Sequence, residues 1–399
     1  MPAADSSSPA STLTFHEVLV RWGPAYLERW GCAMPARQRE VLATLLSCRT
    51  PQRGGQLWRC PQGHYYHYAY HSCNDRHCPQ CGNAQGQEWL DRQFHRLLLP
   101  VDYFLITFTV PEPLRRWMRS HPKSGYDQFF AASAQALQDL ARNPQRLGAQ
   151  LGFMGLLHTN SRTMIFHPHV HYLVPGGGLS LDGRQWVAPK GKFLLHHKPL
   201  ADHFRNLFRQ GLEQHAPEAL QEIPRKVWRQ RWVVNVEAVG NGENALRYLG
   251  RYVFHTATGN RRLPLLPDGR LRWTYRNSRT HKIESIDLEP FELIRRFLQH
   301  VLPAGYCRVR YFGWLSPAAR KKANRVRGLL GRLPQLSAAE QAAWQMPADL
   351  FDPLFPEEVP IEVQPRLCPH CQRPLILRAT WRAGQIPPRP PAVSARSPP

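Results

Sequence analysis

Three histidines in the run HPHVHYLV stand at alternating positions in a segment that predicts a β-strand. Side chains two residues apart project from the same face of a strand, about 7 Å from one another along it. His169 and His171 can therefore coordinate one metal ion together. We expect a third ligand from the preceding predicted strand, where His158 stands, and His167 is the alternative for that place.

Neutral imidazole nitrogens bind divalent metal ions. Three such ligands would leave open positions on an octahedral ion such as Mg²⁺ or Mn²⁺, where a phosphate oxygen can bind. The pattern therefore indicates a catalytic metal site. The competing interpretation is that the three histidines lie on a solvated face or are satisfied within the core.

Two tyrosines stand four residues apart in ENALRYLGRYVF, a segment of helical composition that follows a Gly-Asn-Gly turn. Tyr248 and Tyr252 therefore share one face of a helix, one turn apart. A phenolic oxygen can attack phosphorus to form a phosphotyrosine linkage, and two tyrosines can serve two strands. Arg247 and Arg251 repeat the spacing and are candidates for binding DNA phosphates. The alternatives are packing for the tyrosines and simple solvent exposure for the arginines.

Residues 48–82 lack a helical period and are rich in Cys, His, Gly and aromatic side chains, which is typical of a loop-dominated module held by metal. Cys60, His64, Cys78 and Cys81 form a C-x3-H and C-x2-C pattern that suits one tetrahedral Zn²⁺ ion. The ligand set and the number of ions stay open, because the same segment offers further candidates, namely Cys48, Cys73 and His77. The alternative is a group of reduced structural cysteines beside surface histidines.

A second cysteine pair, Cys368 and Cys371 in LCPHCQRP, has the spacing of half a zinc knuckle. No other such pair lies near it in the sequence. The pair is either an accidental doublet or binds a metal ion together with a distant partner.

Basic residues dominate the composition: the 399-residue chain has 52 Lys and Arg against 29 Asp and Glu, a net charge of +23. The excess is spread along almost the whole chain, which favours a polyanionic partner over a basic surface that serves solubility or binds acidic lipid. No window approaches the roughly 20 apolar residues that span a bilayer, and no secretion signal opens the chain. We therefore expect a cytoplasmic protein that does not interact with membranes.

The hydrophobic pattern predicts a mixed α+β fold with an antiparallel sheet. Helical segments are expected within 13–47 and at 126–142, 200–215, 243–254 and 317–333. Strands are expected at 101–111, 151–160, 166–174 and 228–239, with the second and third of these paired as a hairpin.

Five stretches of the sequence resemble the rolling-circle transposases of the IS-ninety-one family, which belong to the HUH superfamily of single-strand endonucleases. They are YHSCNDRHCPQC, FTVPEPL, LHTN followed by HPHVHYLVPGGGL, YLGRYVFHTATGNRRL and FELIRRFLQHVLPAGYCRVRYFGWL. Together they span about residues 15–315. The resemblance implies an HUH-type antiparallel sheet flanked by helices and preceded by a small zinc-binding module.

The resemblance also implies roles for individual residues. In that family the His-hydrophobic-His pair binds the catalytic divalent metal, which corresponds to His169 and His171, and the nucleophilic tyrosines correspond to Tyr248 and Tyr252. Related relaxases carry a third metal-binding histidine eleven residues before the pair, where His158 stands. The implied activity is nicking and rejoining of single-stranded DNA through a 5′-phosphotyrosine intermediate during rolling-circle transposition.

Many relatives have a second cysteine where this chain has Gly63 and His64, so His64 is expected to replace that ligand. Five regions are expected. They are a flexible N terminus at 1–14, a helical segment with the zinc-binding domain at 15–98, an HUH tyrosine transposase domain at 99–315, a basic segment with the CPHC doublet at 316–378, and a disordered proline-rich tail at 379–399.

The expected partners are the single-stranded ends of a mobile DNA element and its target, in the bacterial cytoplasm and at the nucleoid when DNA is bound. No small-molecule substrate is expected, and the sequence leaves the oligomeric state open. Two alternatives remain: a zinc-dependent DNA-binding regulator without catalytic activity, and a replication initiator or relaxase with the same chemistry. An HExxH-type hydrolytic zinc enzyme does not fit, because the sequence lacks that motif.

Overall fold

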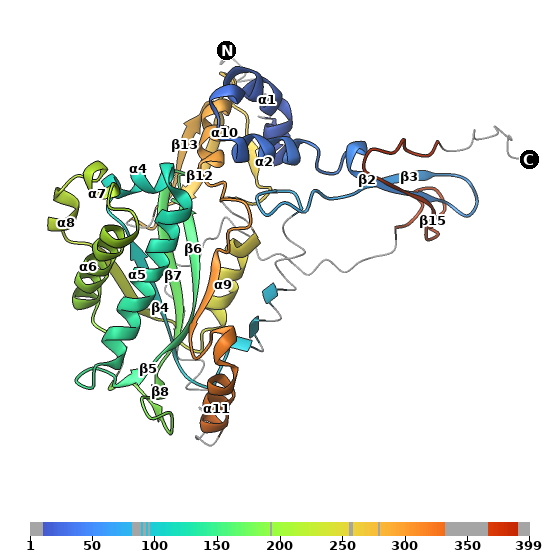
Figure 1. Ribbon diagram of the computed structural model, residues 1–399. Helices are drawn as coiled ribbons and strands as arrows, with labels where there is room; N and C mark the ends of the chain where they lie inside the picture. Colours follow the sequence, from blue (N-terminus) through green and yellow to red (C-terminus); the bar gives the residue numbers. More distant parts are fainter. Residues whose placement is uncertain are drawn as a thin grey trace, which may run out of the picture.

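A five-stranded antiparallel sheet, in the order β10-β4-β7-β6-β14, forms the centre of the protein (Figure 1). Its strands are β4 (Tyr103–Thr109), β6 (Gly152–Asn160), β7 (Phe166–Pro175), β10 (Val233–Ala238) and β14 (Val309–Gly313). The computed structural model describes residues 11–81, 89–90, 93–94, 96–191, 194–254, 258–277, 280–331 and 366–389, except the side chains of 251–254.

The predicted hairpin of this sheet is confirmed, because β6 and β7 pair with each other in antiparallel register. β4 consists of YFLITFT, a run of aromatic and β-branched residues that suits a buried strand. It pairs with β7 on one side and with β10 on the other. The predicted α+β class is therefore correct, and β14 was not among the predicted strands.

Helices cover both faces of this sheet (Figure 1). One face packs against α5 and α6 in the largest hydrophobic core, which buries Val170 and Tyr172 of β7. The other face packs against α9, where Leu246 and Leu249 are buried with Leu173 of β7. Successive residues of β7 thus belong to opposite layers. The helices of these layers are α4 (Glu112–Ser120), α5 (Pro122–Arg142), α6 (His197–His215), α9 (Glu243–Phe254) and α11 (Arg320–Leu330).

The N-terminal helices share a second core with elements from residues 262–298. A capping box opens α1, in which the Thr14 hydroxyl accepts from the Glu17 backbone N–H and the Glu17 carboxylate accepts from the Thr14 N–H. Phe15 of α1 packs against Phe297 of α10, with ring centroids 5.0 Å apart. The elements of this layer are β1 (Thr12–Thr14), α1 (Phe15–Trp30), α2 (Ala36–Leu46), β11 (Arg262–Pro264), β12 (Leu271–Arg276), β13 (Ile283–Leu288) and α10 (Pro290–Leu298).

A separate three-stranded antiparallel sheet, in the order β15-β2-β3, projects away from the central sheet (Figure 1). Its strands are β2 (Gly54–Arg59), β3 (Tyr66–Tyr70) and β15 (Ile376–Arg382). The segment 48–82 therefore contains a hairpin where the sequence predicted loops. Strand β15 comes from the C-terminal region and pairs with β2 from Ile376 to Arg382, with a shift in register between Leu377 and Ala379.

Both predicted terminal regions are partly wrong. The prediction of a disordered tail at 379–399 does not hold for residues 379–382, because they belong to β15 and pair with β2. The prediction of a flexible N terminus at 1–14 does not hold for Thr12–Thr14, because these residues form β1 and pair with β11. Residues 1–10 and 390–399, and much of the basic segment predicted at 316–378, lie outside the described part of the chain.

Several short elements lie between those already given. They are η1 (Gly31–Ala33), η2 (Pro51–Arg53), β5 (Ala149–Gln150), β8 (Gly178–Ser180), β9 (Trp186–Val187), α7 (Ala219–Glu222), α8 (Lys226–Arg229) and η3 (Pro317–Ala319). Within the residues that the structure describes, no helix has both the length and the apolar character needed to cross a bilayer.

Candidate active site and metal centres

The β6–β7 hairpin places three histidines, the histidine trio of His158, His169 and His171, on the sheet face that α9 covers. His158 pairs directly with His169, and His171 follows two residues later on β7. The ring centroids are 5.2 Å apart for His158 and His169, 4.6 Å for His158 and His171, and 4.8 Å for His169 and His171. One nitrogen of each ring lies within 4.8 Å of the other two. The structure thus gathers the three predicted ligands and leaves His167 outside the group.

Hydrogen bonds at Nδ1 orient two rings of the trio. The His169 Nδ1–H donates to the carbonyl oxygen of His167 at 2.7 Å, which fixes the tautomer and leaves Nε2 as the free lone pair. The Nδ1 of His171 lies 2.8 Å from the Thr107 hydroxyl oxygen on β4. The Nε2 of His171 is buried and has no hydrogen-bond partner among the described residues. A buried polar atom without a partner is costly, and a bound cation would satisfy it.

Burial keeps the trio neutral. It lowers the pKa of His169 to about 4 and holds the pKa values of His158 and His171 well below the ordinary 6.5. Burial also lowers the pKa of His167 to about 3. Because a metal ion needs the unprotonated imidazole, the trio is ready to bind one at neutral pH without first losing protons.

Tyr248 approaches the trio from α9. Its ring centroid lies 6.1 Å from that of His171, with the two rings almost perpendicular, and its side chain is half-buried. The neighbouring Leu246 and Leu249 are fully buried and hold this helix face against the sheet. Tyr252 lies in the last turn of α9, and its side chain is outside the described set. The structure therefore brings one of the two predicted tyrosines to the trio.

The predicted phosphate-binding arginines also lie on α9. The Arg247 guanidinium is exposed, forms an ion pair with Glu243 at 2.8 Å and lies over the ring of Phe94 at 4.8 Å. The side chain of Arg251 is outside the described residues. Arg247 is thus held on the helix surface by partners of its own chain, and a contact with DNA would have to compete with Glu243.

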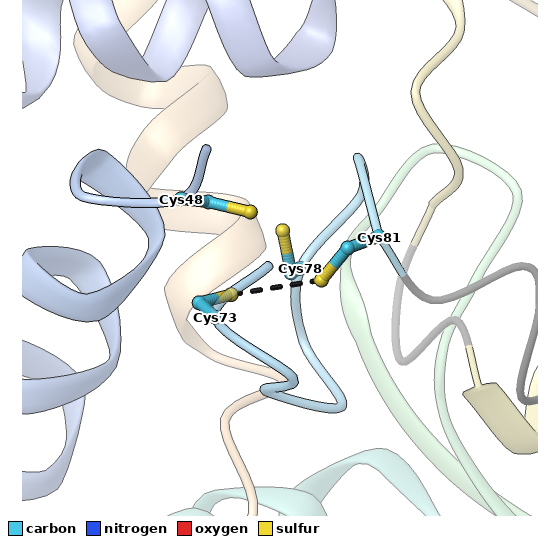
Figure 2. A group of neighbouring side chains, drawn as sticks. All are labelled: Cys48, Cys73, Cys78 and Cys81. Carbon is cyan, nitrogen blue, oxygen red and sulfur yellow. Dashed lines mark hydrogen bonds between the residues drawn. The ribbon is translucent and has the colours of Figure 1, made fainter. Parts of the chain in front are cut away.

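Four cysteines converge near the start of β2 and the end of β3 and form the first cysteine cluster (Figure 2). Its members are Cys48, which follows α2, and Cys73, Cys78 and Cys81 from the loop after β3. The sulfurs of Cys73 and Cys81 lie 3.6 Å apart. A tetrahedral zinc site with Zn–S bonds of about 2.3 Å has sulfurs about 3.8 Å apart, so the cluster has nearly the dimensions of a zinc site with four cysteine ligands.

The predicted ligand set of Cys60, His64, Cys78 and Cys81 is therefore wrong, because its two halves lie in different places. Cys60 follows the end of β2, whereas the first cluster lies near the start of β2 and the end of β3. Six residues of strand separate the two ends by about 20 Å, since a strand rises about 3.3 Å per residue. Beyond the end of β2, Cys60 and His64 lie close to the C-terminal pair Cys368 and Cys371.

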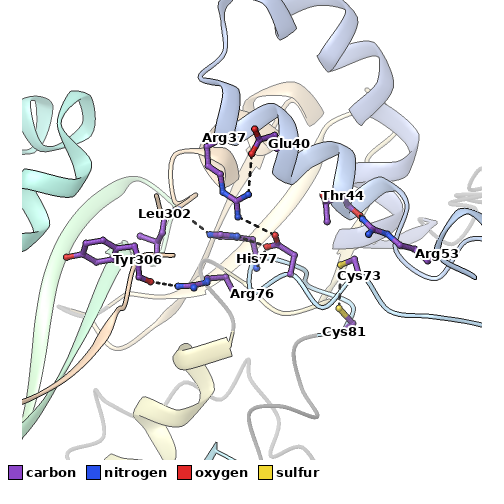
Figure 3. Close-up of polar contacts among 11 residues, drawn as sticks. Arg37, Glu40, Thr44, Arg53, Cys73, Arg76, His77, Cys81, Leu302 and Tyr306 are labelled. Atoms are coloured by element: carbon purple, nitrogen blue, oxygen red, sulfur yellow. Dashed lines mark hydrogen bonds and ion pairs between the residues drawn. The ribbon is translucent and has the colours of Figure 1, made fainter. Parts of the chain in front are cut away.

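His77, the remaining alternate zinc ligand, belongs to neither cluster. Its Nδ1–H donates to the Asp75 carboxylate at 2.7 Å, and its Nε2 accepts from the backbone N–H of Leu302 at 3.1 Å. Burial lowers its pKa, and Arg37 approaches the same carboxylate (Figure 3). Both ring nitrogens are thus occupied: Nδ1 bonds within the cysteine loop, and Nε2 joins that loop to the segment after α10. His77 positions the module instead of binding metal.

Two groups near these sites were not found by sequence reasoning. Thr107 supports His171 from a different strand, and only its alternation with Thr109 in a predicted strand could have marked it. The meeting of Cys60 and His64 with Cys368 and Cys371 was also missed. Part of its signal was present, because Cys368 and Cys371 form half a knuckle with no second pair near them in the sequence.

Comparison with known proteins gives matches over most of the chain. Residues 18–110 match the family described as "Transposase zinc-binding domain", and residues 152–323 match the family described as "Putative transposase". The chain is 34% identical over 379 residues to "Putative transposase y4qJ" of Sinorhizobium fredii, which covers 90% of this chain and 92% of the relative. It is 28% identical over 302 residues to "Transposase for insertion sequence element IS801" of Pseudomonas savastanoi pv. phaseolicola, covering 69% and 70%. No solved structure gives a significant match.

Proposed function

The chain belongs to the IS91/IS801 family of transposases, and on that premise we propose that it nicks and rejoins single-stranded DNA through a 5′-phosphotyrosine intermediate during rolling-circle transposition. The observation that carries the proposal is the closeness of Tyr248 to the histidine trio, with its ring 6.1 Å from that of His171. This pairing combines a nucleophile for phosphorus with ligands for a phosphate-binding cation.

The trio fits a divalent cation such as Mg²⁺ or Mn²⁺. Its nitrogens converge within 4.8 Å, its imidazoles are neutral, and the buried Nε2 of His171 needs a partner. When bound, the ion would coordinate the scissile phosphate and offset the negative charge that develops on its oxygens. Thr107 and the His167 carbonyl hold two of the imidazoles in place for this task.

In the proposed cleavage, the hydroxyl oxygen of Tyr248 attacks the phosphorus in line. The bond from phosphorus to the 3′ oxygen breaks, the phenol loses its proton, and the departing oxygen becomes a 3′ hydroxyl. The 5′ phosphate stays on the tyrosine, so the energy of the broken phosphodiester is kept for rejoining. Tyr252, one helical turn along α9, is proposed to make the second cut.

The proposal includes DNA binding by the basic surface and by the zinc module. The net charge of +23 attracts the phosphate backbone whatever its sequence, and Arg247 and Arg251 are proposed contacts near the cut. We assign structural Zn²⁺ to the first cysteine cluster. Four ligands close that site and leave no position for a substrate.

The nucleophile is tested with Tyr248→Phe, Tyr252→Phe and the double variant. A labelled single-stranded oligonucleotide from the end of the element that encodes this chain is incubated with each protein and Mn²⁺, and denaturing gels detect the covalent adduct. We expect no adduct from the double variant, since phenylalanine keeps the ring but has no attacking oxygen. Tyr275→Phe is the matched control, because that hydroxyl bonds Glu284 in the β12–β13 hairpin. An adduct formed by the double variant would refute the assignment.

The metal is tested separately with His169→Ala. We expect loss of the adduct while salt-dependent binding to the same oligonucleotide stays within about twofold, because the phosphate contacts that dominate affinity lie elsewhere. Equal loss of binding and cleavage would instead give His169 a role in folding and contradict the metal assignment.

A further inference from the structure

We propose that Cys60, His64, Cys368 and Cys371 bind a second Zn²⁺ ion, which fastens the C-terminal segment to the N-terminal module. The four ligand atoms lie within 4.8 Å of one another. The sulfurs of Cys60 and Cys371 are 3.5 Å apart, close to the edge of about 3.8 Å expected in a tetrahedral site. Three thiolates and one imidazole are a common zinc ligand set.

The two halves of this site are closed by the same kind of backbone hydrogen bond, although they come from opposite ends of the chain. The N–H of Cys60 donates to the carbonyl of Tyr65 at 2.8 Å, and the N–H of Cys368 donates to the carbonyl of Arg373 at 2.9 Å. Each loop is thus closed by a bond from its first cysteine to the fifth residue after it. Gly63 and Gln372 take left-handed backbone conformations, with φ of 78° and 58°. Two turns that each contain a left-handed residue and close with the same kind of bond therefore present their ligands to a shared point.

The small sheet holds these turns at the same end. In the β15–β2 register, Ile376 lies opposite Arg59, so β15 begins beside the residue that precedes Cys60. The ring of Trp381 lies over Gly55 at the other end of the sheet, where a β-carbon would stand 2.8 Å from a ring atom. The register places Cys368 and Cys371 over the loop that carries Cys60 and His64.

The apolar core at this end is too small to hold the segment by itself. Among the described residues its buried members are Cys60, Cys368 and Leu375, so two of the three are ligands. A three-stranded sheet needs a hydrophobic face to be stable by itself, and where that face is small a structural metal can supply the missing stability. The entropy cost of closing a loop grows only slowly with its length, so the long stretch of chain between the two halves is no obstacle.

A disulfide explains the cluster less well than a metal does. Bonded sulfurs lie about 2.0 Å apart, and all nine cysteines are unpaired in the structure. A disulfide would also leave His64 and the remaining cysteine without a reason to converge. The length of β2 keeps this site well apart from the first cysteine cluster, so the two clusters hold separate ions.

The zinc content of the full-length chain tests the proposal. Elemental analysis of Cys371→Ser should show one equivalent of zinc fewer than the wild-type chain, whereas the exposed Cys32→Ser control should keep the wild-type content. Hydrogen exchange should become at least tenfold faster at the β15 amides of Cys371→Ser and stay unchanged in the β12–β13 hairpin. An unchanged zinc content in Cys371→Ser would overturn the proposal.

The variant His64→Cys tests whether the zinc loss expected in Cys371→Ser could instead result from misfolding. This variant should keep the full zinc content, because cysteine supplies the fourth ligand in place of imidazole. After replacement of zinc by Co²⁺, its absorption spectrum should lose the contribution of a site with three thiolates and one imidazole and approach that of two all-thiolate sites. A spectrum identical to that of the wild-type chain would exclude His64 as a ligand and overturn the proposal. Neither measurement depends on DNA cleavage.

Discussion

His300 is expected to make the protein sensitive to acid, because its imidazole is buried in the neutral form. Its Nδ1 lies 3.1 Å from the Thr159 hydroxyl oxygen and its Nε2 lies 3.1 Å from the Met164 carbonyl oxygen. Thr159 directly follows His158 in β6, so His300 fastens the segment after α10 to the hairpin that carries the trio. Burial lowers the pKa of His300 from 6.5 to about 4, and nearby His77 acts in the same direction.

The sign of the effect follows from proton uptake. The folded pKa lies below the unfolded one, so between about pH 4 and 6.5 the unfolded chain binds more protons than the folded chain. The contribution of His300 to stability is therefore complete above about pH 6.5 and is lost as the pH falls towards 4. With these two pKa values, acidification from pH 7 to pH 5 removes about 2 kcal/mol.

The assay is thermal unfolding of the wild-type chain and His300→Gln at several pH values. Glutamine can still donate to the Met164 carbonyl but does not titrate. Other buried histidines act in the same direction in both proteins, so the difference between the two curves isolates His300. The wild-type melting temperature should fall by about 2 °C more than that of His300→Gln between pH 7 and pH 5. The exposed His215→Gln control should follow the wild type, and parallel curves for wild type and His300→Gln would refute the reasoning.

Two further outcomes are expected. Thr107→Val removes the hydroxyl that orients His171 and should weaken Mn²⁺ binding, measured by calorimetry, about tenfold or more. The control Thr109→Val should leave the affinity unchanged, because the Thr109 hydroxyl donates to a backbone carbonyl of β10. Equal Mn²⁺ affinities of Thr107→Val and the wild-type chain would exclude an orienting role for Thr107. Cys48→Ser should release the zinc of the first cysteine cluster and lower the melting temperature by several degrees, whereas Cys32→Ser should change neither, and retention of that zinc would exclude Cys48 as a ligand.

The histidine trio could be predicted from sequence because all the information it needs is local. A period of two in HPHVHYLV indicates both the strand and the face that carries His169 and His171. The hairpin partner is the nearest strand along the chain, so His158 follows from the short connection. The placement of Tyr248 and Tyr252 one turn apart in one helix follows in the same way from local spacing, although the distance of Tyr248 from the trio does not.

The partition of the zinc ligands could not be predicted, because it depends on pairing between distant segments. Sequence proximity groups Cys60 with Cys78, yet the intervening hairpin carries them to opposite ends of the small sheet. Cys368 and Cys371 are brought close to Cys60 by the pairing of β15 with β2. The polar and aromatic residues of β15 do not strongly predict a strand. The role of His77 could not be predicted for a similar reason, since its hydrogen-bond partner Leu302 lies 225 residues away in the sequence.

The face on which the trio lies is decided by residues that take no part in the chemistry. A slip of one residue in β7 would turn the histidines into the α5 layer and Tyr172 towards α9. Tyr172 opposes that slip, because its buried hydroxyl lies 2.7 Å from the Ser133 hydroxyl on α5. Its ring also needs the space beside its strand partner Gly155, where a β-carbon would stand 2.5 Å from a ring atom. One glycine and one buried hydroxyl pair on the far layer thus fix the register that faces His158, His169 and His171 towards Tyr248.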